Sequence, residues 1–89
     1  MDERELVEKA KTNKEYFAKL YEAYFERIYS YIYYRTFNKQ TTEDLTSETF
    51  FKVLKNIDRY KYKENVPFSS WIFKIAQNVV NDYYRKKKD

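Results

Sequence analysis

The sequence has 89 residues and a formal net charge of +4, which is enough chain for one small domain with a single core. It contains no Cys and no His, which excludes disulfides, thiol nucleophiles, Ser-His-Asp triads and the usual zinc sites. Glycine is also absent, so glycine-rich phosphate loops are excluded and tight hairpins are disfavoured.

The N-terminal part of the chain predicts a short helix followed by a long one. Residues 4–11 have the pattern of a short charged helix, which ends at the break Thr12-Asn13. Either of these two residues is a suitable N-cap for the second helix, with Glu15 near the positive end of the helix dipole. This second helix is predicted to reach about Phe37. Its apolar side chains keep helical spacing at Phe17, Leu20, Tyr21, Tyr24, Ile28, Tyr31 and Ile32.

A third helix is predicted after a turn at residues 38–40. Thr41 or Thr42 can cap its backbone donors, while Glu43 and Asp44 lie near the positive end of its dipole. The helix continues through the segment LTSETFFKVLKNI. The residues expected to face the core are Leu45, Thr49, Phe50, Val53, Leu54 and Ile57.

Residues 58–66 lack a helical stripe and indicate a polar loop, after which Pro67 with Ser69 or Ser70 opens a last helix. The apolar stripe of that helix is wide, and it consists of Phe68, Trp71, Ile72, Ile75, Ala76, Val79, Val80 and Tyr83. The opposite face carries Lys74, Gln77, Asn78, Asn81, Asp82 and Arg85. We therefore expect the apolar face to fix the helix and the polar face to bind something negatively charged.

The charge is unevenly distributed along the chain. Residues 1–51 hold eight basic and ten acidic side chains, whereas residues 52–89 hold ten basic and four acidic ones. The two halves are therefore expected to face different partners. Taken together, the patterns predict one all-α domain over residues 1–89, a bundle of three main helices plus a short N-terminal helix, with a linker starting at residues 85–89.

The segments TEDLTSETFFKVLKNIDRY and PFSSWIFKIAQNVVNDYYRKKK together resemble region 2 of the extracytoplasmic-function branch of bacterial sigma-70 factors. The resemblance covers Glu43 to Lys87. It implies a cytoplasmic, nucleoid-associated bacterial protein that is not an enzyme and needs neither metal nor cofactor. It also implies three partners: the β′ clamp helices of the RNA polymerase core, the single-stranded non-template minus-10 element of promoter DNA, and a possible anti-sigma factor.

The resemblance also assigns roles to residues. The polymerase-binding surface falls on the third helix, where Ser47 stands in place of the family's usual Gln, and it comprises Asp44, Ser47, Glu48, Phe51 and Lys52. On the DNA side, Asn78 matches a residue lining the pocket for a flipped base, and Tyr60 matches an aromatic at the loop edge that can stack. The full DNA-binding set is Tyr60, Lys61, Lys63, Lys74, Asn78, Asn81, Arg85 and Lys86.

Physical chemistry gives independent support for these roles. An Asn side chain offers a hydrogen-bond donor and an acceptor together, as the edge of a base requires. The cations at 59, 61, 63 and 85–88 can neutralise phosphates, which predicts binding that weakens steeply with salt.

Other interpretations remain open. Asp44 and Glu48 can simply be solvated residues in the first turns of their helix. The carboxylate pairs Glu22/Glu26 and Asp44/Glu48 also resemble fragments of a metal-binding bundle, but such a site would normally add His ligands, which this chain lacks. Trp71 lies in the apolar stripe and is expected to pack in the core, whereas Phe73 lies outside it and fits either an exposed contact or a second packing surface. The alternative function is a basic amphipathic module that binds an anionic membrane or a protein. Against the membrane, the stripe is needed for the core, and no apolar run reaches roughly 18 residues.

Overall fold

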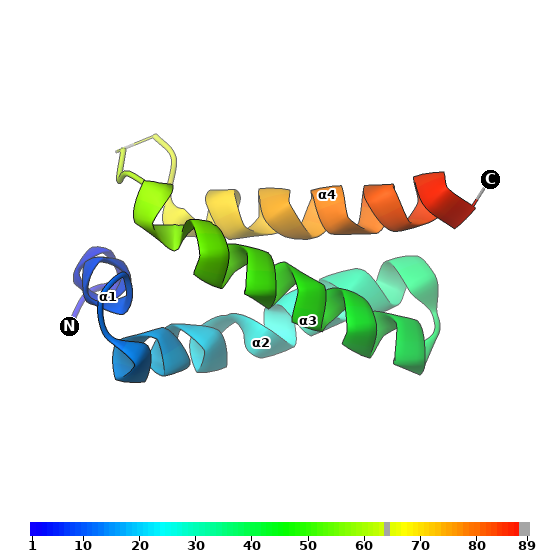
Figure 1. The fold of residues 1–89 in the computed structure, drawn as a ribbon, viewed down its shortest axis with the longest axis horizontal. Coiled ribbons are helices and arrows are strands. Elements are labelled where there is room, and N and C mark those ends of the chain that lie inside the picture. The colour runs from blue at the N-terminus through cyan, green and yellow to red at the C-terminus, as the bar shows by residue number, and fades with distance from the viewer. Residues whose placement is uncertain (64, 88–89) are drawn as a thin grey trace.

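The computed structural model describes residues 1–63 and 65–87. In chain order, this part of the protein forms α1 (Glu3–Ala10), α2 (Lys14–Thr36), α3 (Lys39–Asn56), the 3₁₀ helix η1 (Ile57–Arg59) and α4 (Phe68–Lys87). The ribbon shows α2, α3 and α4 running along the length of the molecule, with α1 seen end-on beside the beginnings of α2 and α4 (Figure 1). The prediction of an all-α bundle with three main helices and a short N-terminal helix is confirmed.

The long helix α2 supplies one side of the core. Leu20, Tyr24, Ile28 and Ile32 follow one another at intervals of four and are all buried, because that spacing keeps them on one face of a helix. The predicted cap is also present, since the Asn13 side chain accepts a hydrogen bond of 2.9 Å from the backbone N–H of Glu15.

The start of α3 differs from the prediction. The helix begins at Lys39, and its cap is Asn38, whose side chain accepts a hydrogen bond of 2.9 Å from the backbone N–H of Thr41. Thr42 is instead fully buried, and its hydroxyl bonds the Asn38 carbonyl and the Thr36 hydroxyl, each at 2.8 Å. The expectation that Thr41 or Thr42 caps the helix was therefore wrong, because an asparagine three residues upstream reaches the free backbone donors first.

One expected core position of α3 is exposed. Leu54 was predicted to face inward, but its side chain is 54% exposed. The core-facing side of α3 carries small threonines as well as large apolar residues, and Thr42, Thr46 and Thr49 are all buried. The other five predicted positions are buried, so Leu54 lies just beyond the edge of a face that the pattern otherwise placed correctly.

The last helix packs as its apolar stripe predicts. Phe68, Ile72, Ala76, Val79 and Val80 are buried, which contributes about 1.5–3 kcal/mol for each of the larger side chains. The residues at the edges of the stripe are half-buried, namely Trp71, Ile75 and Tyr83. Because the stripe belongs to the core, α4 is held in a fixed rotation with its polar face in solvent.

Two sequence predictions concern aromatic residues near this stripe. The Trp71 ring packs 5.4 Å from the Tyr60 and Phe68 rings, as expected for a residue at the core. Phe73 is half-buried with its ring edge-on to Tyr31 at 5.5 Å, so the structure favours a second packing surface over an exposed contact.

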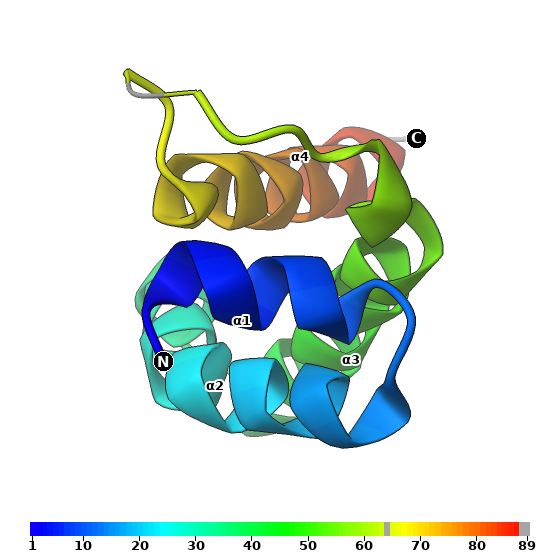
Figure 2. The ribbon, with the colours of Figure 1, turned by 90° about the vertical axis from the view of Figure 1, so that its left-hand side faces the viewer.

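The segment between η1 and α4 crosses the end of the bundle where α1 lies (Figure 2). In that view α1 sits between α2 and the first turns of α4. Lys88, the last member of the predicted phosphate-neutralising run, lies outside the described residues together with Asp89. The residues at 85–87 still belong to α4, and the linker at 85–89 stays a prediction.

Candidate functional site

The exposed face of α4 carries the amide and basic side chains identified in the sequence. Lys74, Asn78, Asn81 and Arg85 are all exposed, and their spacing of three, four and seven residues places them along one side of the helix. We call these four residues the α4 ridge. The buried opposite face prevents the helix from turning them inward, so they form a polar surface with a fixed orientation.

The C-terminal end of the α4 ridge contains an ion pair. The guanidinium of Arg85 bonds the Asp82 carboxylate one turn earlier, while the Arg85 side chain remains 74% exposed. Such an exposed pair contributes at most about 1 kcal/mol to stability. Its main effect is to orient the arginine, whose remaining N–H groups stay accessible to an anion.

A basic pocket lies at the other end of α4, between its first turns and the loop that follows η1. It has a volume of about 310 Å³ and is lined by Arg59, Tyr60, Lys61, Lys63, Val66 and Trp71. We call it the loop pocket. This volume lies within the range of about 300–1,000 Å³ that is typical of small-ligand sites. The three cations are exposed and so can meet phosphates at its rim.

Tyr60 does not have the exposed ring expected of an aromatic that stacks on a base. It is only 5% exposed, with its ring 5.3 Å from Phe68 and 5.4 Å from Trp71, and its hydroxyl donates a 3.2 Å hydrogen bond to the Val66 carbonyl. Burial, reinforced by nearby Glu3, raises the pKa of the Tyr60 phenol. The expectation of free stacking by Tyr60 is therefore corrected, and Trp71 is the half-buried aromatic that lines the pocket.

Asn78 is exposed but does not line the loop pocket. It lies seven residues beyond Trp71, which places it nearly on the same side of α4 and about 10 Å further along the helix. Of the predicted DNA-binding residues, the structure thus gathers Tyr60, Lys61 and Lys63 at the pocket. It places Lys74, Asn78, Asn81 and Arg85 on the ridge that leads away from it.

The outer side of α3 presents the second predicted surface. Asp44, Ser47, Glu48 and Phe51 are exposed, and Lys52 is half-buried beside Glu48 with 3.4 Å between the charged atoms. The Asp44 carboxylate also accepts a hydrogen bond of 3.0 Å from the Gln40 amide. The predicted residues therefore do share one helix surface, which we call the α3 surface.

One apolar residue beside the α3 surface, Leu54, was missed in the sequence. Phe51 is 63% exposed, and Leu54, one turn further along, is 54% exposed. Together these two side chains give one exposed turn of α3 an apolar area that a protein partner can bury. The signal was present in the pattern but was assigned to the core, because Leu54 also fits a helical spacing with Phe50 and Ile57.

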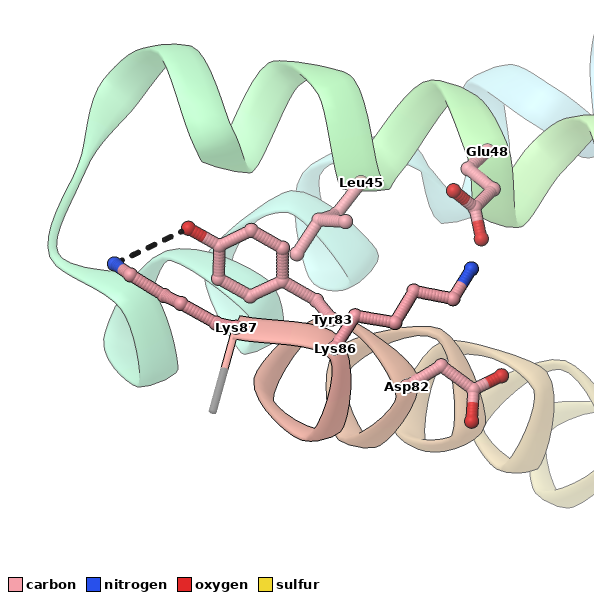
Figure 3. A pocket seen from close by; sticks show the side chains of 6 residues that line it. All are labelled: Leu45, Glu48, Asp82, Tyr83, Lys86 and Lys87. Atoms are coloured by element: carbon pink, nitrogen blue, oxygen red, sulfur yellow. Dashed lines mark hydrogen bonds between the residues drawn. The ribbon is translucent and has the colours of Figure 1, made fainter. Parts of the chain in front are cut away.

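The α3 surface and the end of α4 meet at another pocket, of about 350 Å³ (Figure 3). Lys86 was grouped with the DNA-binding residues, but its side chain points from α4 toward Glu48 of α3. Beside it, Lys87 donates a hydrogen bond of 3.5 Å to the Tyr83 hydroxyl, and bonds from Thr41 and Lys87 lower the pKa of that phenol. Sequence reasoning did not bring these residues together, because they are about 40 positions apart.

A shallow groove between α2 and α4 was also missed. It has a volume of about 510 Å³ and combines aromatic with charged side chains, namely Glu26, Arg27, Ser30, Tyr31, Tyr34, Arg35 and Phe73. The Arg35 guanidinium lies 3.6 Å from the centre of the Tyr31 ring. Stacking of this kind holds an arginine in place while leaving its N–H groups partly free.

Metal-binding clusters and membrane-spanning helices are both absent from the described part of the chain. Within residues 1–63 and 65–87, no three acidic side chains gather in a way that could hold a metal ion. Over the same residues, none of the helices has the length and apolar character needed to cross a membrane.

These features define a class of protein: a small helical domain with a basic, amide-bearing face beside a loop pocket and a separate acidic and apolar face. A family model described as sigma-70 region 2 matches residues 20–89. The chain belongs to the sigma-70 region 2 family, as its motifs indicate.

Two relatives that match almost the whole chain are named as extracytoplasmic-function (ECF) sigma factors. The chain is 41% identical over 85 residues to the ECF RNA polymerase sigma factor BldN of Streptomyces coelicolor, covering 94% of this chain and 32% of that protein. It is 32% identical over 88 residues to the ECF RNA polymerase sigma factor SigW of Bacillus subtilis, covering 99% and 46%. The chain therefore spans 32% and 46% of the length of these two relatives, less than half of each.

A solved structure supports the same assignment. The structure of an RsbN–BldN complex contains a chain that matches this one with a TM-score of 0.80 and 40% identity. The match covers 90% of this chain and 58% of that chain. This chain is thus similar in both fold and sequence to a chain of that complex.

Proposed function

We propose that this chain is a transcription initiation domain that recognises and helps to melt the promoter minus-10 element while bound to the RNA polymerase core. The observation that supports the proposal best is the α4 ridge, which leads from the basic loop pocket along a helix fixed by its buried face. The role is non-catalytic, since RNA synthesis belongs to the polymerase. The proposed location is the bacterial cytoplasm, at the nucleoid.

In the proposed DNA step, one non-template base leaves the stack and enters the loop pocket. Extruding a base costs a few kcal/mol, which stacking and edge hydrogen bonds in a pocket can offset. Trp71 offers the aromatic surface, and Lys61 and Lys63 at the rim offer charge to the flanking phosphates. Tyr60 contributes by shaping the wall, because its own ring is buried.

The strand then continues along the α4 ridge. Lys74 and Arg85 are placed to contact phosphates, while Asn78 and Asn81 present amides to base edges. A rigid helix face reads bases more precisely than a flexible loop, since the positions of its side chains are fixed by the core beneath. This division gives the pocket and the ridge separate roles in one binding event.

The polymerase is proposed to bind at the α3 surface. Asp44 and Glu48 supply negative charge for the β′ clamp helices, and exposed Phe51 with Leu54 supplies apolar area. An anti-sigma factor is proposed as a second protein partner, because the related BldN is found in a complex with RsbN. We further propose that it covers the same surface, where Phe51 and Leu54 expose apolar area. Binding of the two partners would then be mutually exclusive.

The membrane alternative requires the apolar stripe of α4 to be available. That stripe is in the core, where Ile72 and Ala76 have no exposed surface and Val79 is 1% exposed. Binding a membrane by this face would therefore require the domain to open. The structure gives the alternative no exposed apolar face on the described residues of α4.

The proposal is tested by binding the chain to a library of randomised single-stranded hexamers, with the variant Asn78→Ala beside the wild type. Loss of a paired amide interaction is expected to weaken discrimination at one base position by about 1–3 kcal/mol. Gln77→Ala is the matched control, because it removes an exposed amide of α4 that is not one of the four ridge residues.

A wild-type chain that shows no base preference at any hexamer position would refute the proposed function. Loss of preference in both amide variants alike would show that the α4 ridge has no special role. Anionic liposomes in parallel decide the membrane alternative, which predicts flotation of the folded chain.

A further inference from the structure

The short helix α1 lies outside residues 20–89, which match the sigma-70 region 2 family, and yet the turn that ends it touches the loop that forms the loop pocket. The Lys11 amine donates a hydrogen bond of 2.7 Å to the backbone carbonyl of Tyr60, across 49 positions of sequence. The same amine lies 2.9 Å from the Glu8 carboxylate, and the Lys11 side chain is only 16% exposed. Lys11 is thus a largely buried, charge-paired donor to this loop.

The carbonyl that Lys11 binds belongs to the residue that holds the loop closed. Tyr60 donates a 3.2 Å hydrogen bond from its hydroxyl to the Val66 carbonyl, and its ring packs against both Phe68 and Trp71. The far side of the loop is closed by a 2.9 Å bond from the Val66 N–H to the Lys63 carbonyl. A shift at Tyr60 would therefore move both the loop and the aromatic wall of the pocket.

The loop carries like charges at the pocket. Arg59, Lys61 and Lys63 are exposed and line the same pocket, so their charges repel one another. Lys11 adds little further repulsion of that kind, since its charge is offset by Glu8. A second contact from α1 also holds the loop in place. The Arg4 guanidinium lies 4.5 Å from the centre of the Tyr62 ring.

We propose that Lys11 is a positioning residue for promoter recognition: its bond to the Tyr60 carbonyl fixes the loop against Trp71 and so sets which base the loop pocket accepts. This inference rests on the proposed function, and it adds that the α1 end of the chain takes part in base selection without touching DNA. The requirement is geometric, because a charged hydrogen bond to a carbonyl holds the loop in one place.

The test uses the 89-residue chain with Lys11→Met, which keeps the approximate length of the side chain and removes its donors. Lys9→Met is the matched control, because Lys9 lies on α1 itself, pairs with Glu5 at 3.4 Å and lies beside Tyr16 instead of the loop. Lys11→Arg restores a charged donor. Thermal melts confirm that each variant is folded.

Two readouts separate positioning from general stability. Trp71 is the single tryptophan, so acrylamide quenching of its fluorescence reports on the pocket wall without any DNA. In Lys11→Met we expect quenching to rise, and base discrimination on the hexamer library to fall about tenfold at one position. The slope of log affinity against log salt should not change, since every phosphate contact is retained. Lys9→Met should match the wild type, and Lys11→Arg should recover most of both effects.

Four outcomes would overturn the inference or its basis. Unchanged quenching and unchanged base preference in Lys11→Met would show that the loop does not depend on this bond. If Lys11→Met binds every hexamer sequence equally more weakly and the slope of log affinity against log salt becomes shallower, Lys11 contacts a phosphate directly. If the wild type itself has no base preference, the proposed function fails, whereas a wild-type preference that Lys11→Met retains refutes the positioning role alone.

Discussion

Tyr24 makes the stability of the domain depend on alkaline pH in a way that can be calculated. Its side chain is 1% exposed, and its hydroxyl donates a hydrogen bond of 2.9 Å to the Glu3 carboxylate, which ties α1 to α2. Burial raises the pKa of Tyr24 most, and the hydrogen bond to Glu3 and the negative charge of Glu3 add to this increase, which takes the pKa from an ordinary value of 10.0 to about 12. The folded state therefore holds the phenol proton more tightly than the unfolded state does.

The sign and size of the effect follow from this difference in pKa. The stabilisation is fully present below pH 10, where both states are protonated, and is lost as pH rises from 10 toward 12. Each pKa unit corresponds to about 1.36 kcal/mol, so the free energy of unfolding should fall by about 1.4 kcal/mol at pH 11 and by about 2.7 kcal/mol in total. Tyr24→Phe should lose about 1 kcal/mol at neutral pH, because the Glu3 bond is gone, and should then lack this alkaline decrease.

Urea unfolding followed by circular dichroism at pH 8 and pH 11 measures this difference. Tyr34→Phe is the control, because Tyr34 is 67% exposed and its removal leaves the buried phenol in place. It should lose stability with pH as the wild type does. The reasoning is refuted if Tyr24→Phe shows the same alkaline decrease as these two proteins.

Two further predictions concern the binding surfaces. Replacing Asp44 and Glu48 by Lys should abolish binding to a fragment that contains the β′ clamp helices and leave hexamer binding nearly normal. If both activities are lost together with helicity, the variant has a folding defect instead. Neutralising the basic residues at 85–87 should make the slope of log affinity against log salt shallower by up to about 2, since each single-strand phosphate that is no longer neutralised contributes about 0.7. An unchanged slope would show that the strand binds elsewhere.

The fold could be predicted from the sequence where the apolar and polar residues of a helix separate clearly onto two opposite faces. In α4 the apolar stripe and the polar residues opposite it lie where the pattern placed them, because burying that stripe outweighs local preferences. Capping was less certain. Asn13 was one of two candidates at its helix, but at α3 the pattern offered Thr41 and Thr42, and the nearby Asn38 binds the free donors instead.

The candidate site was harder to predict, because its important contacts join distant segments. The pattern of residues 58–66 indicates a polar loop and does not show that Tyr60 folds back against Phe68 and Trp71. The bond from Lys11 to the Tyr60 carbonyl has no local signature at all. Exposed ridge residues could be identified from helical spacing, whereas the loop pocket exists only once α1, the loop and α4 are assembled.

The basic residues at the end of α4 show how binding and stability can be linked in so small a domain. Arg85, Lys86 and Lys87 lie in the last turn, where the negative end of the helix dipole stabilises each cation by about 0.3–1 kcal/mol. The same dipole offsets part of their mutual repulsion, so the charges can be concentrated there before any DNA binds. Neutralising them therefore removes a local stabilising effect as well as the proposed phosphate contacts. The two effects separate with salt, because the loss of helix stability is seen without DNA, whereas the change in slope requires it.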